Sequence, residues 1–270
     1  IINQLHYNAT NDGRTAVHTA AEAGNVSMVH LLCSELGASA KAADKNGATV
    51  LWYAARSGHE NVVRVLAKDY GADVNAANKN GWTPIIQAAL KGLDGMVRLL
   101  VNELGANVQL ANKNGWNCCH AAAEKGHAST MKLLVNDLML SVHAPSNDGR
   151  SPIWVAASNG QEAMVRLLVR ELGADVNMPN NTGWTPLMQA ASKGYDSVVR
   201  LLVELGANPR IPNKAGWTAV HACADKGHGA TLRMLVLELG ASASVSSSDG
   251  RTPVYAAAAA GQETMVRLLL

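Results

Sequence analysis

The sequence predicts an all-α chain built from repeated helical hairpins, and three observations lead to this fold class. Close variants of one segment recur eight times along 270 residues, at intervals of 34 residues with one interval of 33. Each copy places a residue that favours helix starts two positions after a glycine, and a second glycine eleven positions after the first. Apolar residues at helical spacing follow that second glycine. Each copy therefore contains two short helices.

The first helix of a copy is predicted from its end signals. In the copy at residues 78–111, Thr83 is a helix N-cap whose hydroxyl can accept from backbone N–H groups, and Pro84 loses no hydrogen bond at the first helical position. Gly92 suits the left-handed residue that ends a short helix. A helix is therefore expected between Thr83 and Gly92.

The second helix is predicted from its apolar face. That face is formed by Met96, Val97, Leu99 and Leu100. Gly105 should end this helix, and the polar run that follows, up to Gly115, is typical of a hairpin-like loop leading into the next copy.

Two departures from the regular pattern predict local differences in structure. The interval of 34 residues indicates one extra residue in the second helix or its exit, because LLVNELGA stands where residues 201–207 read LLVELGA. Met139 takes the place that glycine holds in the other copies, and a left-handed Met would be strained. We expect residues 138–141 to adopt a different conformation, or the helix to run on.

The segment resembles the ankyrin repeat, whose consensus runs roughly G-x-T-P-L-H-x-A-A-x-x-G-H, then x-x-V-x-x-L-L, then x-x-G-A-D-V-N. The first glycine of this pattern occurs at Gly13, Gly47, Gly81, Gly115, Gly149, Gly183, Gly216 and Gly250. The resemblance implies an ankyrin-repeat solenoid of stacked helix-turn-helix units with protruding hairpin-like loops. It also implies a curved shape whose concave face binds other macromolecules, mostly proteins.

The resemblance covers nearly the whole chain and predicts its domain organisation. Residues 1–270 form a single array, with residues 1–12 as the tail of a preceding repeat. The repeats are expected to begin near residues 11, 45, 79, 113, 147, 181, 214 and 248, and the last one is truncated. Neither end has a polar outer face, so the chain is expected to be a piece of a longer protein.

Composition narrows the class of protein. Apolar residues make up 48 % and charged residues 16 %, which provides ample material for burial between hairpins. The net charge of +2 argues against a general nucleic-acid or membrane-surface binder. Four irregularly spaced cysteines are not typical of a secreted disulfide framework, no apolar run approaches the length of a spanning helix, and no signal-peptide pattern opens the chain. An intracellular monomer, cytoplasmic or nuclear, is expected.

No residue pattern indicates catalysis, a metal or a cofactor. The resemblance assigns His18, His120 and His221 to a structural histidine position, where the ring bonds backbone groups. Adjacent Cys118 and Cys119 diverge by about 100° on a helix and lack a second ligand pair, so they are interpreted as structural. Phosphate-loop, nucleophile-elbow and zinc-protease motifs are absent. We expect no enzyme activity and no cofactor.

The candidate binding residues occupy two positions that face the groove in ankyrin repeats. The position after the first glycine holds a Trp in four repeats and an Arg in three: Trp82, Trp116, Trp184, Trp217, Arg14, Arg150 and Arg251. Nine residues later, the four Trp repeats carry a lysine: Lys91, Lys125, Lys193 and Lys226. Exposed Trp is frequent at binding hot spots, and Lys favours an acidic or acidic-aromatic partner. Two Trp and Lys patches are predicted, on repeats three and four and on repeats six and seven.

Alternative interpretations stay open at this point. Each indole could stack on a neighbouring loop, and the Trp and Lys pairing could follow from duplication of a three-repeat block, because similar repeats recur every 101 or 102 residues. Trp52, Trp154 and Tyr255 are interpreted as packing residues. The favoured function is a non-catalytic protein-interaction scaffold. The alternatives are nucleic-acid or nucleotide recognition by the Trp and Lys patches, or a regulatory arm of a larger enzyme or channel.

Overall fold

The computed structural model describes residues 9–270, so most of the expected tail at residues 1–12 lies outside the described residues. Within this range the chain forms sixteen α-helices and no strand, with one isolated bridge between Ala43 and Thr49. The predicted all-α fold class of stacked helix pairs is confirmed. None of the helices in the described part combines the length and the apolar character that crossing a bilayer would require.

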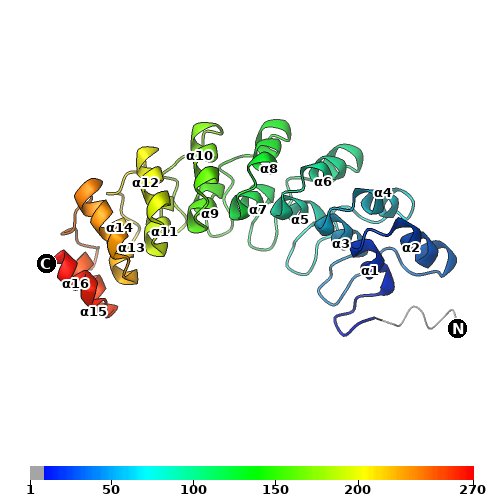
Figure 1. Cartoon of the computed structure of the whole chain (residues 1–270), viewed down its shortest axis with the longest axis horizontal. Coiled ribbons are helices and arrows are strands. Elements are labelled where there is room, and N and C mark those ends of the chain that lie inside the picture. Colours follow the sequence, from blue (N-terminus) through cyan, green and yellow to red (C-terminus); the bar gives the residue numbers. More distant parts are fainter. Residues whose placement is uncertain (1–8) are drawn as a thin grey trace. The chain divides into compact units, whose positions relative to one another are not determined.

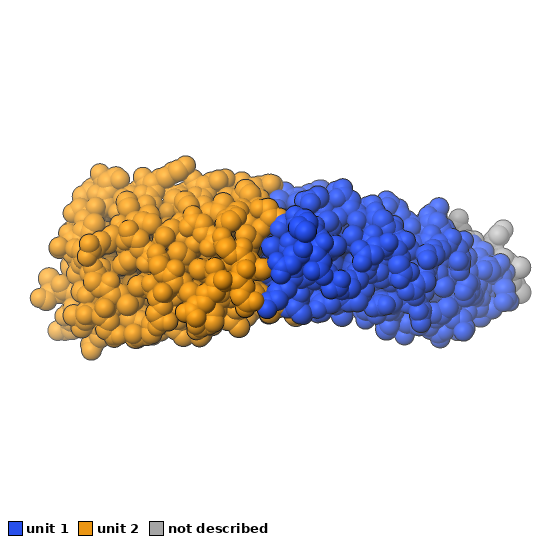
Figure 2. Space-filling view, turned by 90° about the horizontal axis from the view of Figure 1, so that it is seen from above, with its two compact units in different colours: residues 1–122, 129–140 blue, residues 123–128, 141–270 orange. Residues whose placement is uncertain are grey.

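The chain divides into two compact units, which are coloured separately in Figure 2. Among the described residues, unit 1 comprises residues 9–122 and 129–140. Its first helices are α1 (Ala16–Glu22), α3 (Val50–Ser57), α5 (Pro84–Lys91) and the start of α7 (Cys118–Lys125). Its second helices are α2 (Val26–His30), α4 (Glu60–Lys68), α6 (Asp94–Arg98) and most of α8 (Ala128–Lys132).

Unit 2 comprises residues 123–128 and 141–270. Its first helices are α9 (Pro152–Ser158), α11 (Pro186–Lys193), α13 (Ala219–Lys226) and α15 (Pro253–Ala259). Its second helices are α10 (Glu162–Arg170), α12 (Asp196–Glu204), α14 (Gly229–Arg233) and α16 (Glu263–Leu269). Within each unit, successive first helices contact one another and the second helices form a separate layer (Figure 1).

The helix ends follow the local signals of the sequence. Thr83 accepts from the Ile86 backbone N–H at 3.4 Å, which starts α5, and Gly92 ends it in the left-handed region at φ +71°. In unit 2, Thr185 caps α11 in the same way, by accepting from the Met188 N–H at 3.2 Å. Helix starts and ends are therefore set by residues within one turn of each terminus.

The second helices of four 34-residue repeats hold the extra residue, as expected, whereas the second helices of repeats two and five, α4 and α10, stay α-helical. Four of these helices end in a π-helical turn: η2 (Leu31–Glu35), η3 (Leu99–Glu103), η4 (Leu133–Asp137) and η5 (Met234–Glu238). At the exit of η3, the Leu104 N–H donates to the Leu99 carbonyl five residues back. In the 33-residue repeat, α12 stays α-helical and the Leu205 N–H donates to the Leu201 carbonyl. A π-turn holds one more residue than an α-turn, so it accommodates the insertion.

The expectation for Met139 is wrong, because Met139 adopts the left-handed conformation at φ +57°. The exit keeps the geometry of the glycine repeats: the Leu138 N–H donates to the Leu133 carbonyl, and the Leu140 N–H donates to the Leu134 carbonyl. Leu140 is also buried, with 3 % of its surface exposed. These two backbone bonds and the buried leucine impose the conformation, and Met139 accommodates it with its side chain 78 % exposed.

Replacing Met139 with Gly should stabilise the protein by about 1 kcal/mol, because glycine adopts the left-handed conformation without the cost that other residues carry. Little packing is lost, since the Met139 side chain is exposed. Urea unfolding followed by circular dichroism measures the change. A Met139→Ala variant is the control and should gain much less. Equal stabilisation by Ala and Gly would contradict this explanation.

Backbone hydrogen bonds join successive loops within each unit. In unit 1, the Lys79 N–H donates to the Asn46 carbonyl at 2.7 Å, and the Lys113 N–H donates to the Asn80 carbonyl at 3.0 Å. In unit 2, the Lys214 N–H donates to the Thr182 carbonyl at 3.1 Å. These bonds hold the loop tips in register, and thereby fix the residues that follow each tip.

Candidate functional site

Trp184 is held at the base of a rigid loop in unit 2. The Asn180 side-chain oxygen accepts from the Thr182 N–H at 3.0 Å and from the Trp184 N–H at 2.9 Å. Trp184 itself is half-buried, and the cap residue that begins α11 follows it directly. Lys193, the last residue of α11, is exposed. The loop and one short helix therefore fix the spacing between the backbones of Trp184 and Lys193.

A groove of about 460 Å³ brings four of the predicted site residues together in unit 2. These four are Arg150, Trp184, Lys193 and Lys226. The lining is completed by Trp154, Ser158, Asn180, Thr182, Gln189 and Ser192. The groove thus extends over parts of three successive repeats, from α9 through α11 to the end of α13.

The groove is cationic. It is lined by three basic side chains and by no carboxylate. Arg150 pairs with Asp148 at 2.7 Å and Lys226 pairs with Asp225 at 2.9 Å, and both pairs are partly exposed, where such pairs stabilise little. Within residues 9–270, no carboxylate lies at ion-pair distance from Lys193. A ligand that enters this groove meets three basic side chains and two indole rings, one of which lies under the Arg150 guanidinium.

Trp154 is both a packing residue and part of this groove. Its side chain is only 6 % exposed, and the Arg150 guanidinium lies 4.6 Å from its ring centroid. Its indole Nε1 is buried and has no hydrogen-bond partner among the described residues. In unit 1, by contrast, Trp52 Nε1 donates to the Trp82 carbonyl at 3.0 Å.

Trp217 and Trp116 each stack on the motif histidine of their own repeat. The ring centroids of Trp217 and His221 are 5.6 Å apart, and those of Trp116 and His120 are 5.8 Å apart. His221 is fully buried, and its Nδ1 accepts from the Thr218 N–H at 3.2 Å. Burial lowers the pKa of His221, which favours the neutral ring. One face of each of these two indoles is therefore covered by a structural imidazole.

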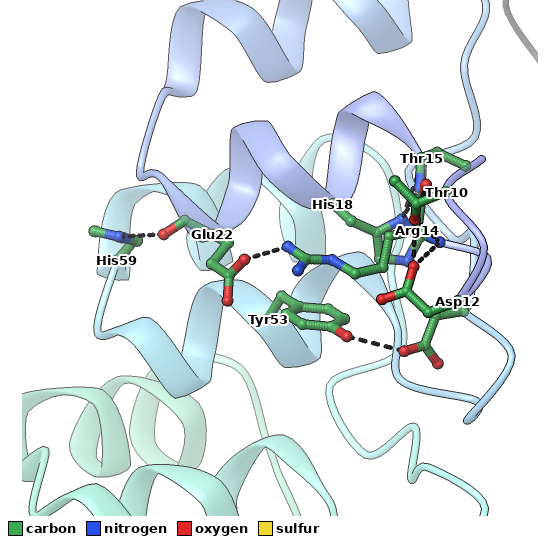
Figure 3. A network of polar contacts seen from close by, with 9 residues as sticks. Thr10, Asp12, Arg14, Thr15, His18, Glu22, Tyr53 and His59 are labelled. Atoms are coloured by element: carbon green, nitrogen blue, oxygen red, sulfur yellow. Dashed lines mark hydrogen bonds and ion pairs between the residues drawn. The ribbon is translucent and has the colours of Figure 1, made fainter. Parts of the chain in front are cut away.

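Arg14 belongs to a polar network in unit 1 that Figure 3 shows. Its guanidinium pairs with Glu22 and lies 4.5 Å from the Tyr53 ring centroid. The Tyr53 hydroxyl donates to Asp44 at 2.9 Å. Burial and the Asp44 carboxylate raise the pKa of Tyr53 to about 12. The network links the first loop to α3, so Arg14 has a structural role.

The remaining candidates are distributed over both units. Trp82, Trp116 and Lys91 lie in unit 1, whereas Lys125 lies in unit 2, where it pairs with Glu124 at 2.9 Å. Arg251 lies over the Tyr255 ring at 5.3 Å and pairs with Asp249 at 2.9 Å. The patch expected on repeats three and four stays a prediction.

Six lining residues of the groove are not among the predicted site residues: Trp154, Ser158, Asn180, Thr182, Gln189 and Ser192. Gln189 Nε2 donates to the Ser158 hydroxyl at 3.1 Å, so these two residues build one wall. A signal was present, because a polar Gln recurs at the same position of the first helix in repeats three and six, as Gln87 and Gln189. In repeat six, this Gln makes the polar contact with Ser158 in the wall of the groove.

The cysteines of α7 lie in the core. Cys118 and Cys119 are fully buried, and burial raises the pKa of both thiols, that of Cys119 to about 12. Across residues 9–270, no group of three or more His, Cys, Asp or Glu side chains is placed to hold a metal ion. Both thiols stay protonated at neutral pH and pack as small apolar groups.

Comparison with known protein families gives one match that spans the chain. The family model described as ankyrin repeats (3 copies) matches residues 1–78, 70–144, 135–213 and 205–270. A search of curated proteins finds no match to the chain.

Proposed function

Because the chain belongs to the ankyrin repeat family, whose domains generally act as protein-interaction modules, we propose that it is a non-catalytic scaffold that binds a protein partner in the groove of unit 2. The observation that carries the proposal is the composition of the groove. Arg150, Lys193 and Lys226 line the space together with two indole rings, and no carboxylate lines it. The partner is an extended acidic segment, and the groove lies on the side that the family resemblance predicts to be concave.

The division of roles follows from burial and charge. Trp184 is half-buried on a rigid loop, so it offers a pre-ordered apolar anchor that loses little entropy on binding. Lys193 and Lys226 are exposed, so they attract an acidic chain over a distance and raise its association rate. Affinity therefore depends on Trp184, and the salt dependence of association depends on the lysines.

The stacking of Trp116 and Trp217 favours a protein over a single-stranded nucleic acid as the partner. Nucleic-acid binders of this kind offer aromatic faces on which successive bases stack. Here one face of each of these indoles is covered by a buried histidine, and Trp154 is 6 % exposed. Trp184 alone does not provide a base-stacking track.

Counter-selection with a random peptide library tests the proposal. The library is selected on the protein and depleted on a triple variant, Trp184→Ala with Lys193→Glu and Lys226→Glu. Selected peptides should be rich in Asp and Glu, and the triple variant should weaken their Kd at least about tenfold, since a hot-spot anchor and two attractive charges are lost.

The matched control is Arg166→Glu, which reverses an exposed charge on α10 in the second-helix layer. This variant should bind the selected peptides as tightly as the original chain does. Circular dichroism and thermal unfolding verify that both variants fold. Peptides that bind the triple variant equally well would contradict the proposal. Displacement of every selected peptide by a single-stranded oligonucleotide would favour the nucleic-acid reading instead.

A further inference from the structure

The unpartnered indole N–H of Trp154 is a buried donor in the wall of the groove. Trp154 lines the groove, is 6 % exposed, and has no acceptor for Nε1 among the described residues. Buried donors in native proteins almost always have a partner. An exception at a groove wall points to an acceptor that arrives with a ligand.

The equivalent residue in unit 1, Trp52, has an indole N–H that is hydrogen-bonded. Trp52 occupies the same position of its repeat, and its Nε1 donates to the Trp82 carbonyl 30 residues further along the chain. Trp184 follows Trp154 at the same separation, yet Trp154 Nε1 makes no hydrogen bond to it. The two indoles occupy equivalent positions of their repeats, but only the Trp52 N–H has a hydrogen-bond acceptor among the described residues.

The arginine beside the indole also differs between repeat two, which contains Trp52, and repeat five, which contains Trp154. Arg56 lies 5.5 Å from the Trp52 ring centroid and comes one turn after it, whereas Arg150 lies 4.6 Å from the Trp154 ring centroid and precedes it. Repeat two has Ala48 at the position of Arg150, so only in repeat five does a cation from the loop lie over the indole. Arg150 is also a lining residue of the groove.

The chemistry around Trp154 identifies the missing acceptor. The cations of the groove are Arg150, Lys193 and Lys226, and all three are donors without acceptor capacity. One N–H of the nearby Gln189 amide donates to Ser158. We infer that Trp154 is a specificity-determining residue whose indole N–H donates to a carboxylate oxygen of an acidic segment bound in the groove. This inference rests on the proposed function.

A carboxylate fits this role better than a neutral acceptor. A Glu or Asp side chain has two oxygens with several lone pairs, so one oxygen can accept from the indole N–H while the other pairs with a cation. A backbone carbonyl would leave the positive charge of the groove unbalanced. Because Nε1 is buried in the free protein, the side chains around it shift to admit the ligand.

Indole N–H signals in NMR spectra test the inference, since each of the six tryptophans gives one such signal. The probe is the acetylated, amidated peptide Gly-Glu-Asp-Tyr-Glu-Asp-Gly, and its control is Gly-Gln-Asn-Tyr-Gln-Asn-Gly. The Trp154 indole proton, assigned with a Trp154→Phe variant, should move downfield with the acidic peptide. With the amide peptide it should move at least tenfold less, and the Trp52 signal should stay in place with both.

An isosteric replacement isolates the N–H group. Trp154 replaced by 3-benzothienylalanine keeps the shape of the indole and lacks its donor, so the Kd for the acidic peptide should weaken about tenfold. The same replacement at Trp52 is the matched control and should leave that Kd unchanged. Thermal unfolding checks that both proteins stay folded.

The possible outcomes distinguish a failure of the inference about Trp154 from a failure of the proposed function. If the acidic peptide shifts the Trp184 indole and Lys193 amide signals, and the replacement at Trp154 leaves the Kd unchanged, the groove binds acidic segments and the role of Trp154 is overturned. If neither Trp154 nor Trp184 responds to millimolar acidic peptide, both the inference and the acidic partner are overturned. A downfield Trp154 signal together with the weaker Kd supports both.

Discussion

Replacing Gly81 with Ala should destabilise unit 1 by about 3 kcal/mol, which combines left-handed strain with a backbone clash. Gly81 has φ +83°, and a Cβ atom there would lie 2.7 Å from the Lys113 backbone nitrogen. That nitrogen donates to the Asn80 carbonyl, so it cannot move without breaking the bond between the two loops. Urea unfolding measures the loss, and hydrogen exchange at residues 112–116 shows whether this loop opens.

Gly105→Ala is the matched control for Gly81→Ala. Gly105 has φ +69°, but a Cβ atom there would meet nothing within 4 Å. This variant should lose only the free energy that alanine needs to adopt the left-handed conformation, about 1 kcal/mol. Equal losses at the two positions would show that close approach of the loops contributes nothing.

Replacing Asp44 with Ala should destabilise unit 1 by about 3 kcal/mol, because it leaves several buried donors without an acceptor. Asp44 is buried and accepts from the Asn46 and Ala48 N–H groups at 2.8 Å each. It also accepts from the Tyr53 hydroxyl at 2.9 Å. The free energy of unfolding at pH 7 is the measurement.

Asp44→Asn is the control that keeps the backbone acceptor. The chain itself uses Asn at this position of four other repeats, where its side-chain oxygen accepts from the same two backbone groups: Asn78, Asn112, Asn180 and Asn213. The Asn variant should stay within about 1 kcal/mol of the original chain. A loss as large as that of Ala would mean that the charge of Asp44 is needed rather than its acceptor.

The tryptophans show where prediction from sequence reached its limit. The spacing identified a recurring Trp and Lys pair, and four of the eleven predicted contact residues line one groove. Spacing did not distinguish Trp184, which lines the groove, from Trp217, which stacks on His221. Both follow a glycine and precede a Thr cap, and they differ in the residue four positions later, which is Met188 in one repeat and His221 in the other.

The sequence by itself determined the helix pairs, their ends and the place of the inserted residue, because caps, glycines and π-turns act between residues a few positions apart. The tertiary structure decided which side chains share a surface. It also decided that Met139 takes the left-handed conformation and that Trp154, unlike Trp52, has an unpartnered N–H. The bonding state of Trp154 depends on contacts between residues about 30 positions apart, whereas the conformation of Met139 depends on the burial of Leu140 and on the backbone bonds beside it.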